Sequence, residues 1–320
     1  MRLLVTGGAG FIGSNFVRRI IDGTFKDISG VTVVDKLTYA GSESNLAILP
    51  KQSFSFIKAD VCDVEVMKRV VPGHDAIINF AAESHVDRSI SGSRDFVVTN
   101  ILGVQTLLQT ALESDLKTFV QISTDEVYGS IDYGSWDEDF SLLPNSPYAA
   151  SKASADLMTR AYFRTFGLDT RITRCSNNYG PYQFPEKIIP FFVTNLIDGK
   201  KIPLYGSGAN MRDWLHVDDH CQGIYAVLMK GRPGEIYNIG GGRELTNKEL
   251  TLMILKYMGK NVDSIEFVKD RLGHDLRYSV NHSKITGELD YHPTIKFEDG
   301  LQETIDWYRK HEKWWRDLKK

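Results

Sequence analysis

Tyr148 and Lys152 lie four residues apart in the segment PYAASKASADLM, a spacing that places both side chains on one face of a helix, one turn apart. A tyrosine with an ordinary pKa of about 10 is a poor base at neutral pH. A neighbouring lysine cation would stabilise the phenolate, so this pair could remove a proton from a hydroxyl. An isolated pair with this spacing is more typical of a solvated surface, so its meaning depends on the rest of the chain.

A second group of polar residues follows an apolar, strand-like segment, residues 119–122. Ser123 and Thr124 come first, and two adjacent acids, Asp125 and Glu126, come next. Such acids can simply stabilise a turn or cap a helix. Two neighbouring carboxyl groups whose surroundings push their pKa values apart can instead divide the roles of acid and base. We therefore expect this pair to transfer protons at two neighbouring atoms of a substrate.

Six short apolar segments, separated by helical stretches, must position these side chains. Their continuous Val, Ile and Phe content indicates a parallel sheet that is buried on both faces. The segments are residues 3–5, 31–34, 54–57, 76–80, 119–122 and 170–173. Helices are expected over residues 11–21 and 148–166. The expected fold class is therefore α/β, a Rossmann-type doubly wound parallel sheet.

A glycine-rich turn, GGAGFIG over residues 7–13, lies between the first segment and the first helix. Glycines let backbone N–H groups approach a pyrophosphate, and the helix N-terminus favours its negative charge. Asp35 ends the second segment, 22 residues after Gly13, where an acid accepts hydrogen bonds from a ribose and repels a 2′-phosphate. The pattern predicts NAD rather than NADP, although the Lys36 cation acts against that preference. Asp60, which ends the third segment, is expected either to contact adenine or to cap a helix.

The chain changes character after residue 176, where Pro, Gly and Asn become frequent. We expect residues 1–176 to form the NAD-binding domain and residues 177–320 to form a smaller mixed α/β domain that binds the substrate. Residues 217–240 resemble a helix and a strand that return to the first sheet. The tail, residues 297–320, is amphipathic, with apolar side chains near helical spacing at Leu301, Ile305, Trp307 and Trp314.

The composition argues against several classes of function. The 320 residues carry a net charge of −3 and are 42% hydrophobic, which is typical of a globular protein and not of a binder of nucleic acid or anionic membranes. No apolar run approaches the roughly 20 residues of a membrane helix, and the first residues are typical of a strand rather than a secretory signal. Three separated cysteines, Cys62, Cys175 and Cys221, fit a reducing compartment. We expect a cytoplasmic protein.

Two motifs resemble a known family. The glycine spacing, with Gly7, Gly10 and Gly13, is similar to that of the extended short-chain dehydrogenase/reductases, and STDEVYG, residues 123–129, closely resembles the signature of the dTDP-glucose 4,6-dehydratases. The resemblance covers essentially the whole chain. It implies that NAD is the cofactor and that the catalytic residues are Thr124, Asp125 as general acid, Glu126 as general base, Tyr148 and Lys152.

The reaction implied by this resemblance converts dTDP-glucose to its 4-keto-6-deoxy form plus water. Tyr148 takes a proton as carbon 4 is oxidised, and the resulting ketone makes the hydrogen on carbon 5 acidic. Glu126 removes that hydrogen while Asp125 protonates the departing hydroxyl on carbon 6. The stored hydride then returns to carbon 6, so the cofactor ends as it began. A plain dehydrogenase or a 4-epimerase has no need of the two acids.

The resemblance also implies contacts for the two ligands. Cofactor contacts are expected from Gly7, Gly10, Phe11, Ile12, Gly13, Asp35, Lys36, Leu37, Thr38, Asp60, Val61, Ala81, Ala82, Ser84, Thr99, Tyr148, Lys152 and Asn178. Substrate contacts are expected from His85, Thr124, Asn177, Lys187, Ile188, Pro203, Leu204, Tyr205, Arg212, Asn247, Arg271 and His274. The two arginines suit a diphosphate, since guanidinium groups pair with phosphate oxygens. The family usually has Pro where this chain has Leu272, so a φ restraint is lost from that loop.

His216 and His220 invite a zinc interpretation, because histidines four residues apart can share a metal. The residue after His216 is Val217 rather than the Glu of a zinc protease, and Asp218 stands where a helix N-cap belongs. We therefore expect both histidines to be structural and predict no metal.

Alternative functions remain. One is a 4-epimerase, or a dehydratase for another nucleotide, although GDP-mannose and CDP-glucose dehydratases carry a different residue at the position of Asp125. Another is a non-catalytic NAD-binding sensor on the same fold, which would not need Tyr148, Lys152 or the acids. No nucleic acid or membrane partner is expected. The resemblance implies a homodimer built on helices near residues 98–114 and 148–166.

Overall fold

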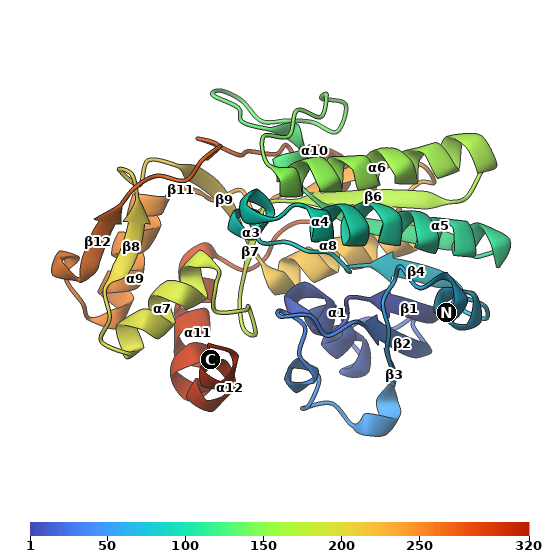
Figure 1. Ribbon diagram of the computed structural model, residues 1–320, viewed down its shortest axis with the longest axis horizontal. Helices are drawn as coiled ribbons and strands as arrows, with labels where there is room; N and C mark the ends of the chain where they lie inside the picture. Colours follow the sequence, from blue (N-terminus) through green and yellow to red (C-terminus); the bar gives the residue numbers. More distant parts are fainter. Residues whose placement is uncertain (320) are drawn as a thin grey trace.

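The computed structural model describes residues 1–319, and its largest element is a seven-stranded parallel sheet (Figure 1). The strand order is β10-β6-β5-β4-β1-β2-β3, and every neighbouring pair is parallel. The strands are β1 (Arg2–Thr6), β2 (Gly30–Asp35), β3 (Ser55–Lys58), β4 (Ala76–Asn79), β5 (Thr118–Thr124), β6 (Thr170–Cys175) and β10 (Ile236–Ile239). This arrangement is the doubly wound Rossmann type, which confirms the expected fold class.

Helices cover both faces of this sheet, because alternate residues of each strand pack on opposite sides. In β1, Leu3 and Val5 belong to one buried cluster and Leu4 to another, and Ile78 and Ile77 of β4 divide in the same way. The first cluster takes in α1 (Phe11–Ile21), α8 (Val217–Lys230) and α10 (Ser283–Leu289). The second takes in α2 (Val64–Val70), α5 (Gly103–Glu113) and α6 (Pro147–Phe166). Burial on both faces explains why the strand segments are continuously apolar.

A smaller mixed α/β region lies beside the sheet (Figure 1). Its three-stranded sheet has the order β11-β9-β7, and its two-stranded sheet pairs β8 with β12. The elements are β7 (Asn177–Tyr179), α7 (Ile188–Ile197), β8 (Ile202–Tyr205), β9 (Met211–His216), β11 (Glu244–Thr246), α9 (Asn247–Met258), β12 (Ile265–Val268), α11 (Phe297–Lys310) and α12 (Glu312–Leu318). They enclose a separate apolar cluster that includes Trp214, Leu250 and Trp315.

Between β4 and α5 the chain forms short helical segments. These are α3 (Val86–Ser91), α4 (Arg94–Val97) and a π-helical turn, Val98–Leu102, that runs into α5. The 3-10 turns elsewhere are η1 (Glu43–Asn45), η2 (Lys51–Ser53), η4 (Asp125–Tyr128) and η5 (Val262–Ser264). Within residues 1–319, no helix has both the length and the apolar character needed to cross a membrane.

The C-terminal tail, in which apolar side chains near helical spacing are expected, is helical over most of its described length. It forms two helices that meet at His311, and Trp315 is buried whereas Trp307 and Trp314 are only half-buried. The two half-buried tryptophans pack on Tyr182, with ring centroids 4.5 and 5.5 Å away. They stay at the surface of the core because they cover a neighbouring loop and do not enter the apolar cluster.

Two consecutive hydrogen bonds also connect Trp314 to the glycine turn. Its Nε1 donates a 3.1 Å hydrogen bond to Oδ1 of Asn45, whose Nδ2 donates a 2.8 Å bond to the carbonyl of Ala9. The last helices of the chain therefore support the loop that follows β1.

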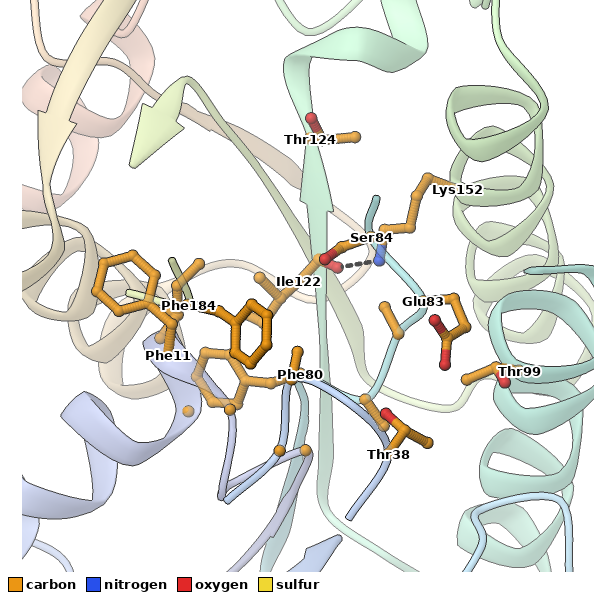
Figure 2. A pocket seen from close by; sticks show the side chains of 18 of the residues that line it. Phe11, Thr38, Phe80, Glu83, Ser84, Thr99, Ile122, Thr124, Lys152 and Phe184 are labelled. Atoms are coloured by element: carbon orange, nitrogen blue, oxygen red, sulfur yellow. Dashed lines mark hydrogen bonds between the residues drawn. The ribbon is translucent and has the colours of Figure 1, made fainter. Parts of the chain in front are cut away.

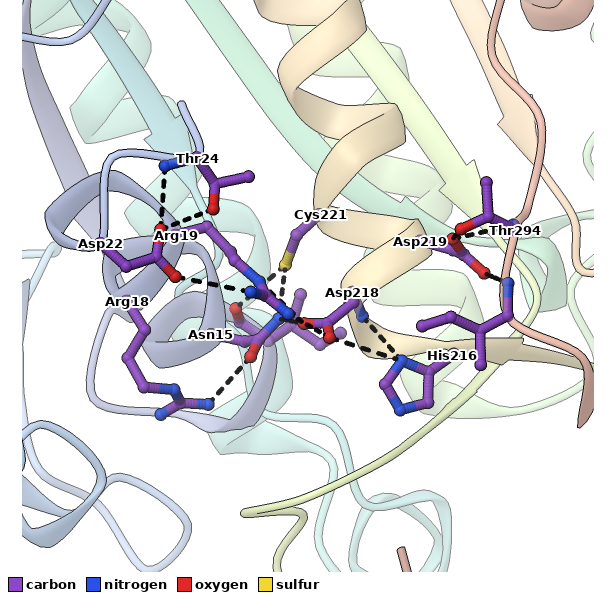
Figure 3. Close-up of polar contacts among 12 residues, drawn as sticks. Asn15, Arg18, Arg19, Asp22, Thr24, His216, Asp218, Asp219, Cys221 and Thr294 are labelled. Atoms are coloured by element: carbon purple, nitrogen blue, oxygen red, sulfur yellow. Dashed lines mark hydrogen bonds and ion pairs between the residues drawn. The ribbon is translucent and has the colours of Figure 1, made fainter. Parts of the chain in front are cut away.

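The prediction that Asp218 caps α8 is wrong. The helix begins at Val217, and the N-cap is His216, whose Nδ1 accepts a hydrogen bond from the backbone N–H of Asp218. The Asp218 carboxylate instead faces α1, where it accepts a hydrogen bond from Asn15 and pairs with Arg19 (Figure 3). Asp218 is one residue inside the first turn, so its side chain is free to join two helices.

Candidate functional site

Two adjoining cavities open at the carboxyl ends of the parallel strands, where ligands bind in folds of this type. The first has a volume of about 300 Å³ and lies over the glycine turn, and the second has a volume of about 780 Å³ and extends into the smaller region. Residues shared by both linings mark their junction: Ser84, Glu126, Asn177, Asn178, Gln183, Phe184, Glu186 and Lys187.

The glycine turn can hold a diphosphate against the N-terminus of α1. Gly7 has a φ of +69°, and a Cβ there would lie 2.5 Å from the backbone N of Ala81. A Cβ at Gly13 would lie 2.4 Å from the carbonyl oxygen of Gly7. Only glycine fits at either position, so helix and strands come close enough for the backbone N–H groups to approach an anion. These residues fit a dinucleotide.

Asp35 lines the first cavity and also organises the loop around it. Its carboxylate accepts a 2.9 Å hydrogen bond from the N–H of Ala9 and a 2.8 Å bond from that of Leu37. Burial raises the pKa of Asp35, and the two N–H groups act against that shift. Because a carboxylate has about four lone-pair sites, it can accept further bonds from ribose hydroxyls.

The other expected acid, Asp60, also lines the first cavity and does not cap a helix. The N-cap of α2 is Asp63. Asp60 accepts a hydrogen bond from the N–H of Cys62 and forms an ion pair of 2.7 Å with Lys36. Against the effect of burial, these partners lower the pKa of Asp60.

All but one of the expected cofactor contacts line the first cavity. They are Gly7, Gly10, Phe11, Ile12, Gly13, Asp35, Lys36, Thr38, Asp60, Val61, Ala81, Ala82, Ser84, Thr99, Tyr148, Lys152 and Asn178. Leu37 is the exception: it has a φ of +57°, and its side chain packs against the apolar core beside α1. Figure 2 also shows Glu83 near Thr38 and Thr99 in this cavity, a residue that the sequence analysis did not select.

Tyr148 and Lys152 lie at the start of α6, which Ser146 caps and Pro147 begins. Both side chains are buried, and Lys152 Nζ donates a 2.5 Å hydrogen bond to the carbonyl oxygen of Ile122 (Figure 2). Burial and the charge of Glu126 raise the pKa of Tyr148 well above its ordinary value, while burial lowers the pKa of Lys152. The protein groups alone therefore keep the phenol protonated.

The acid pair begins η4, directly after β5. Thr124 accepts a hydrogen bond from the N–H of Glu126, and its own hydroxyl lies 3.3 Å from Oδ1 of Asp125. Asp125 is 2% exposed, and within the described chain its Oδ2 has no hydrogen-bond partner. Burial and the charge of Glu126 raise the pKa of Asp125 well above its ordinary value.

Glu126 has different electrostatic surroundings from Asp125. Burial raises the pKa of Glu126 as well, but the cations Arg212, Lys187 and Arg271 act in the opposite direction. Asp125 therefore keeps its proton most strongly, and Glu126 lies where positive charge favours its ionised form. This is the division of properties that an acid and a base at one site require.

The expected substrate residues surround the second cavity, except Thr124, which lines the first. They are His85, Asn177, Lys187, Ile188, Pro203, Leu204, Tyr205, Arg212, Asn247, Arg271 and His274. Arg212 is buried, with its guanidinium 4.2 Å from the centre of the Tyr278 ring. Arg271 has a buried Nε with no partner among residues 1–319, which suits it to meet an anion.

The loop that carries Leu272 is held by a hydrogen bond instead of a proline. Leu272 is 73% exposed, and Nδ1 of His274 lies 2.7 Å from Oδ1 of Asp270 across the turn. This contact restrains the loop from the side that faces the cavity.

A cluster at the junction of the cavities was not predicted. The hydroxyl of Tyr39 donates a 3.0 Å hydrogen bond to Oε1 of Glu186, and the Arg88 guanidinium lies 3.5 Å from the centre of the Tyr39 ring. Nε2 of His85 lies 3.6 Å from the other Glu186 oxygen. These residues come from three separate segments, and the sequence has no local pattern that joins them.

The two histidines of the HVDDH segment have separate roles. His216 caps α8, and Nδ1 of His220 lies 2.8 Å from Oδ1 of Asn178. In the part of the chain that the structure describes, no group of three His, Cys, Asp or Glu side chains could hold a metal ion.

Comparisons with known proteins agree on one family. A family model described as GDP-mannose 4,6 dehydratase matches residues 4–304. A dTDP-glucose 4,6-dehydratase from Streptomyces niveus is 56% identical over 322 residues, which cover 100% of this chain and 96% of that protein.

Solved structures give the same result. A dTDP-glucose 4,6-dehydratase from Streptomyces venezuelae, with NAD and a further ligand bound, is 58% identical with a TM-score of 0.98, over 99% of this chain and 100% of that one. The enzyme of the same name from Bacillus anthracis, in complex with NAD, is 47% identical with a TM-score of 0.92, over 99% of both chains. The chain therefore belongs to the dTDP-glucose 4,6-dehydratase family of the short-chain dehydrogenase/reductases.

Proposed function

We propose that this protein converts dTDP-glucose to dTDP-4-keto-6-deoxyglucose plus water, with NAD as its cofactor. The observation that carries the proposal is the pair Asp125 and Glu126, a buried and a half-buried carboxyl group with unequal electrostatic surroundings. Both line the first cavity, and Glu126 also lies at its junction with the second. The relatives with NAD bound and the glycine turn support the choice of cofactor.

The residues of the chain divide the reaction between them. NAD, when bound, accepts a hydride from carbon 4 of the sugar and returns it at carbon 6. Tyr148 takes the hydroxyl proton from carbon 4, and Lys152 with the positive charge of the oxidised cofactor favours the phenolate. Glu126 removes the proton on carbon 5, and Asp125 donates its proton to the departing hydroxyl.

We assign the first cavity to the dinucleotide and the second to the nucleotide sugar. Arg212 and Arg271 supply guanidinium groups for the diphosphate, and Tyr205 supplies an aromatic face at the far end. Residues 1–176 with the returning segment 217–240 form the NAD-binding domain, and residues 177–320 otherwise bind the sugar nucleotide.

We place the protein in the cytoplasm as a homodimer, and exposed apolar side chains support the homodimer. Val97, Leu102 and Leu157 are each about half exposed on the helices expected to pair. Exposed apolar side chains gathered on neighbouring helices are typical of an interface between subunits.

The test is to incubate the purified protein with NAD and dTDP-glucose in heavy water. Dehydration places deuterium at carbon 5 of the product, because a solvent-exchangeable acid replaces the proton that Glu126 removes. A 4-epimerase would return the starting skeleton with carbon 6 still hydroxylated. Protein that binds NAD but converts none of the dTDP-, UDP- or GDP-sugars would instead be a sensor, and the proposal would be wrong.

A further inference from the structure

Asn178 lies at the junction of the two cavities with both ends of its amide engaged. Its Nδ2 donates a 3.0 Å hydrogen bond to the carbonyl of Ser176, and its Oδ1 lies 2.8 Å from Nδ1 of His220. Gln183 holds the backbone carbonyl of Asn178 through a 2.9 Å bond. Among residues 1–319, Ser176 is the only acceptor for Nδ2, so one amide N–H remains for a ligand.

The protonation state of His220 follows from these contacts. The side chain is 0% exposed, and burial lowers the pKa of His220 to about 3, so the ring is neutral. A neutral imidazole has one donor and one acceptor nitrogen. Because the amide nitrogen of Asn178 faces Ser176, its oxygen faces His220, and the proton must be on Nδ1. Within the described chain, Nε2 has no hydrogen-bond partner.

His216 provides an internal comparison, since it is buried at the N-cap of the helix that carries His220 and makes a different contact. Its Nδ1 accepts a bond from the N–H of Asp218, so a neutral ring carries its proton on Nε2. The two histidines therefore hold opposite tautomers. His216 caps α8, whereas the only polar contact of the His220 side chain in the described structure is with Asn178.

We propose that His220 is a positioning residue, which fixes the amide orientation of Asn178 so that its free N–H holds the carboxamide of nicotinamide. The inference rests on the proposed function, because it takes the cofactor to be NAD. Without the Nδ1–H donor, the amide oxygen loses its partner, and among the described side-chain contacts only the bond to the Ser176 carbonyl still holds the amide. A less firmly held amide would direct its free N–H less well at the carboxamide, and the hydrogen bond to the bound ring would weaken.

The test measures the NAD dissociation constant on protein stripped of cofactor and then titrated with NAD. His220→Leu removes the donor, and we expect roughly tenfold weaker binding from the loss of one well-placed hydrogen bond. His220→Asn restores an N–H close to the position of Nδ1 and should recover most of the affinity. In an Asn178→Ala background, His220→Leu should weaken binding no further, because the two residues act as one unit.

His216→Asn is the matched control, since asparagine is itself a good N-cap and the hydrogen bond of the His216 side chain goes to Asp218 and not to Asn178. It should bind NAD as the wild type does, and melting temperatures of all variants report any general loss of structure. Equal weakening by His220→Leu with and without Asn178 would overturn the inference, as would wild-type affinity in His220→Leu. If the wild type itself fails to bind NAD, the proposed function is wrong and this inference is lost with it.

Discussion

Lys36 and Asp60 form an ion pair, with 2.7 Å between Nζ and Oδ2, across the ends of two neighbouring strands. The pair bears on the choice between NAD and NADP at the end of the first cavity that we assign to adenosine. A free Lys36 would attract the 2′-phosphate of NADP, but its charge is neutralised by Asp60, and Asp35 lies on the same lining. The local balance of charge is therefore negative, which favours a ribose with free hydroxyls.

Releasing Lys36 should change the choice of cofactor. We expect Asp60→Asn to narrow the preference for NAD over NADP by about tenfold, because one repulsive charge is lost and one cation is freed. Titration of stripped protein with each dinucleotide measures the ratio. Asp63→Asn, which removes a carboxylate only from the cap of α2, should leave the ratio unchanged. An equal change in both variants would contradict this account.

Glu126→Gln should separate oxidation from elimination. The variant keeps Tyr148 and Lys152, so carbon 4 should still be oxidised, but the proton on carbon 5 cannot be removed. We expect the absorbance of reduced cofactor to accumulate while product formation falls by at least about 100-fold. Full turnover in this variant would show that another group is the base.

Tyr148→Phe should stop the reaction one step earlier. The phenol oxygen is lost, so no reduced cofactor should appear, and overall turnover should fall by about 100-fold or more. Tyr128→Phe is the matched control, because it removes a buried tyrosine hydroxyl that contacts Arg174 and Asn238. We expect that control to lower the melting temperature and still form reduced cofactor. Reduced cofactor in Tyr148→Phe would refute the assignment.

The ionisation of Asp125 should make the protein less stable as the pH rises. A carboxyl group whose pKa is higher in the folded protein binds more protons there, so stability falls as the pH rises from its unfolded pKa towards its folded pKa. Burial raises the pKa of Asp125 well above its ordinary value. The loss of folding stability that comes from burying this carboxyl group is therefore present at neutral pH. Asp125→Asn should therefore melt about 2 °C or more above the wild type at pH 7.

That difference should shrink as the pH is lowered through about 4, because Asp125 stays protonated in the folded state and becomes protonated in the unfolded state as well. Glu249 is a control with the opposite dependence of stability on pH. The N–H and hydroxyl of Thr246 lower the pKa of this exposed residue of the capping box. Glu249→Ala should melt below the wild type at pH 7 and approach it on acidification. A pH-independent gain in Asp125→Asn would mean that packing, not ionisation, is responsible.

The contact between Tyr39 and Glu186 should slow the loss of cofactor. Tyr39 follows β2 and lines the second cavity, and Glu186 precedes α7 and lines both cavities. Their 3.0 Å hydrogen bond therefore joins two separate segments of the cavity wall. We expect Tyr39→Phe to release NAD about five- to tenfold faster, the effect of losing a hydrogen bond to a charged group. Stopped-flow displacement measures this rate. Tyr225→Phe, which removes a similar bond to Asp27 outside both cavities, should match the wild type.

Local patterns in the sequence predicted the sheet and the loops that carry the site. The bounds of α1 agree with the expected helix and α6 begins one residue before the expected start, because glycines, caps and apolar spacing are properties of neighbouring residues. The acid pair and Tyr148 lie on one lining because parallel strands bring their carboxyl ends to one edge.

Contacts between distant segments could not be predicted in this way. Lys152 is bonded to the carbonyl of Ile122, 30 residues away, and Glu186 meets Tyr39 across 147 residues. The sequence alone did not identify His216 as the N-cap, because histidine is not among the preferred capping residues. It predicted the nearby acid Asp218 instead. The partners of Lys152 and Glu186 are decided by the packing of whole elements, whereas the cap at His216 is a local contact.

The link from Trp314 through Asn45 to the carbonyl of Ala9 joins residues that lie far apart in the sequence. During synthesis, the loop beside Ala9 leaves the ribosome long before Trp314 is translated. That loop can gain this support only after Trp314 has been added to the polypeptide. A truncation that removes α12 would therefore weaken the structure beside the first strand.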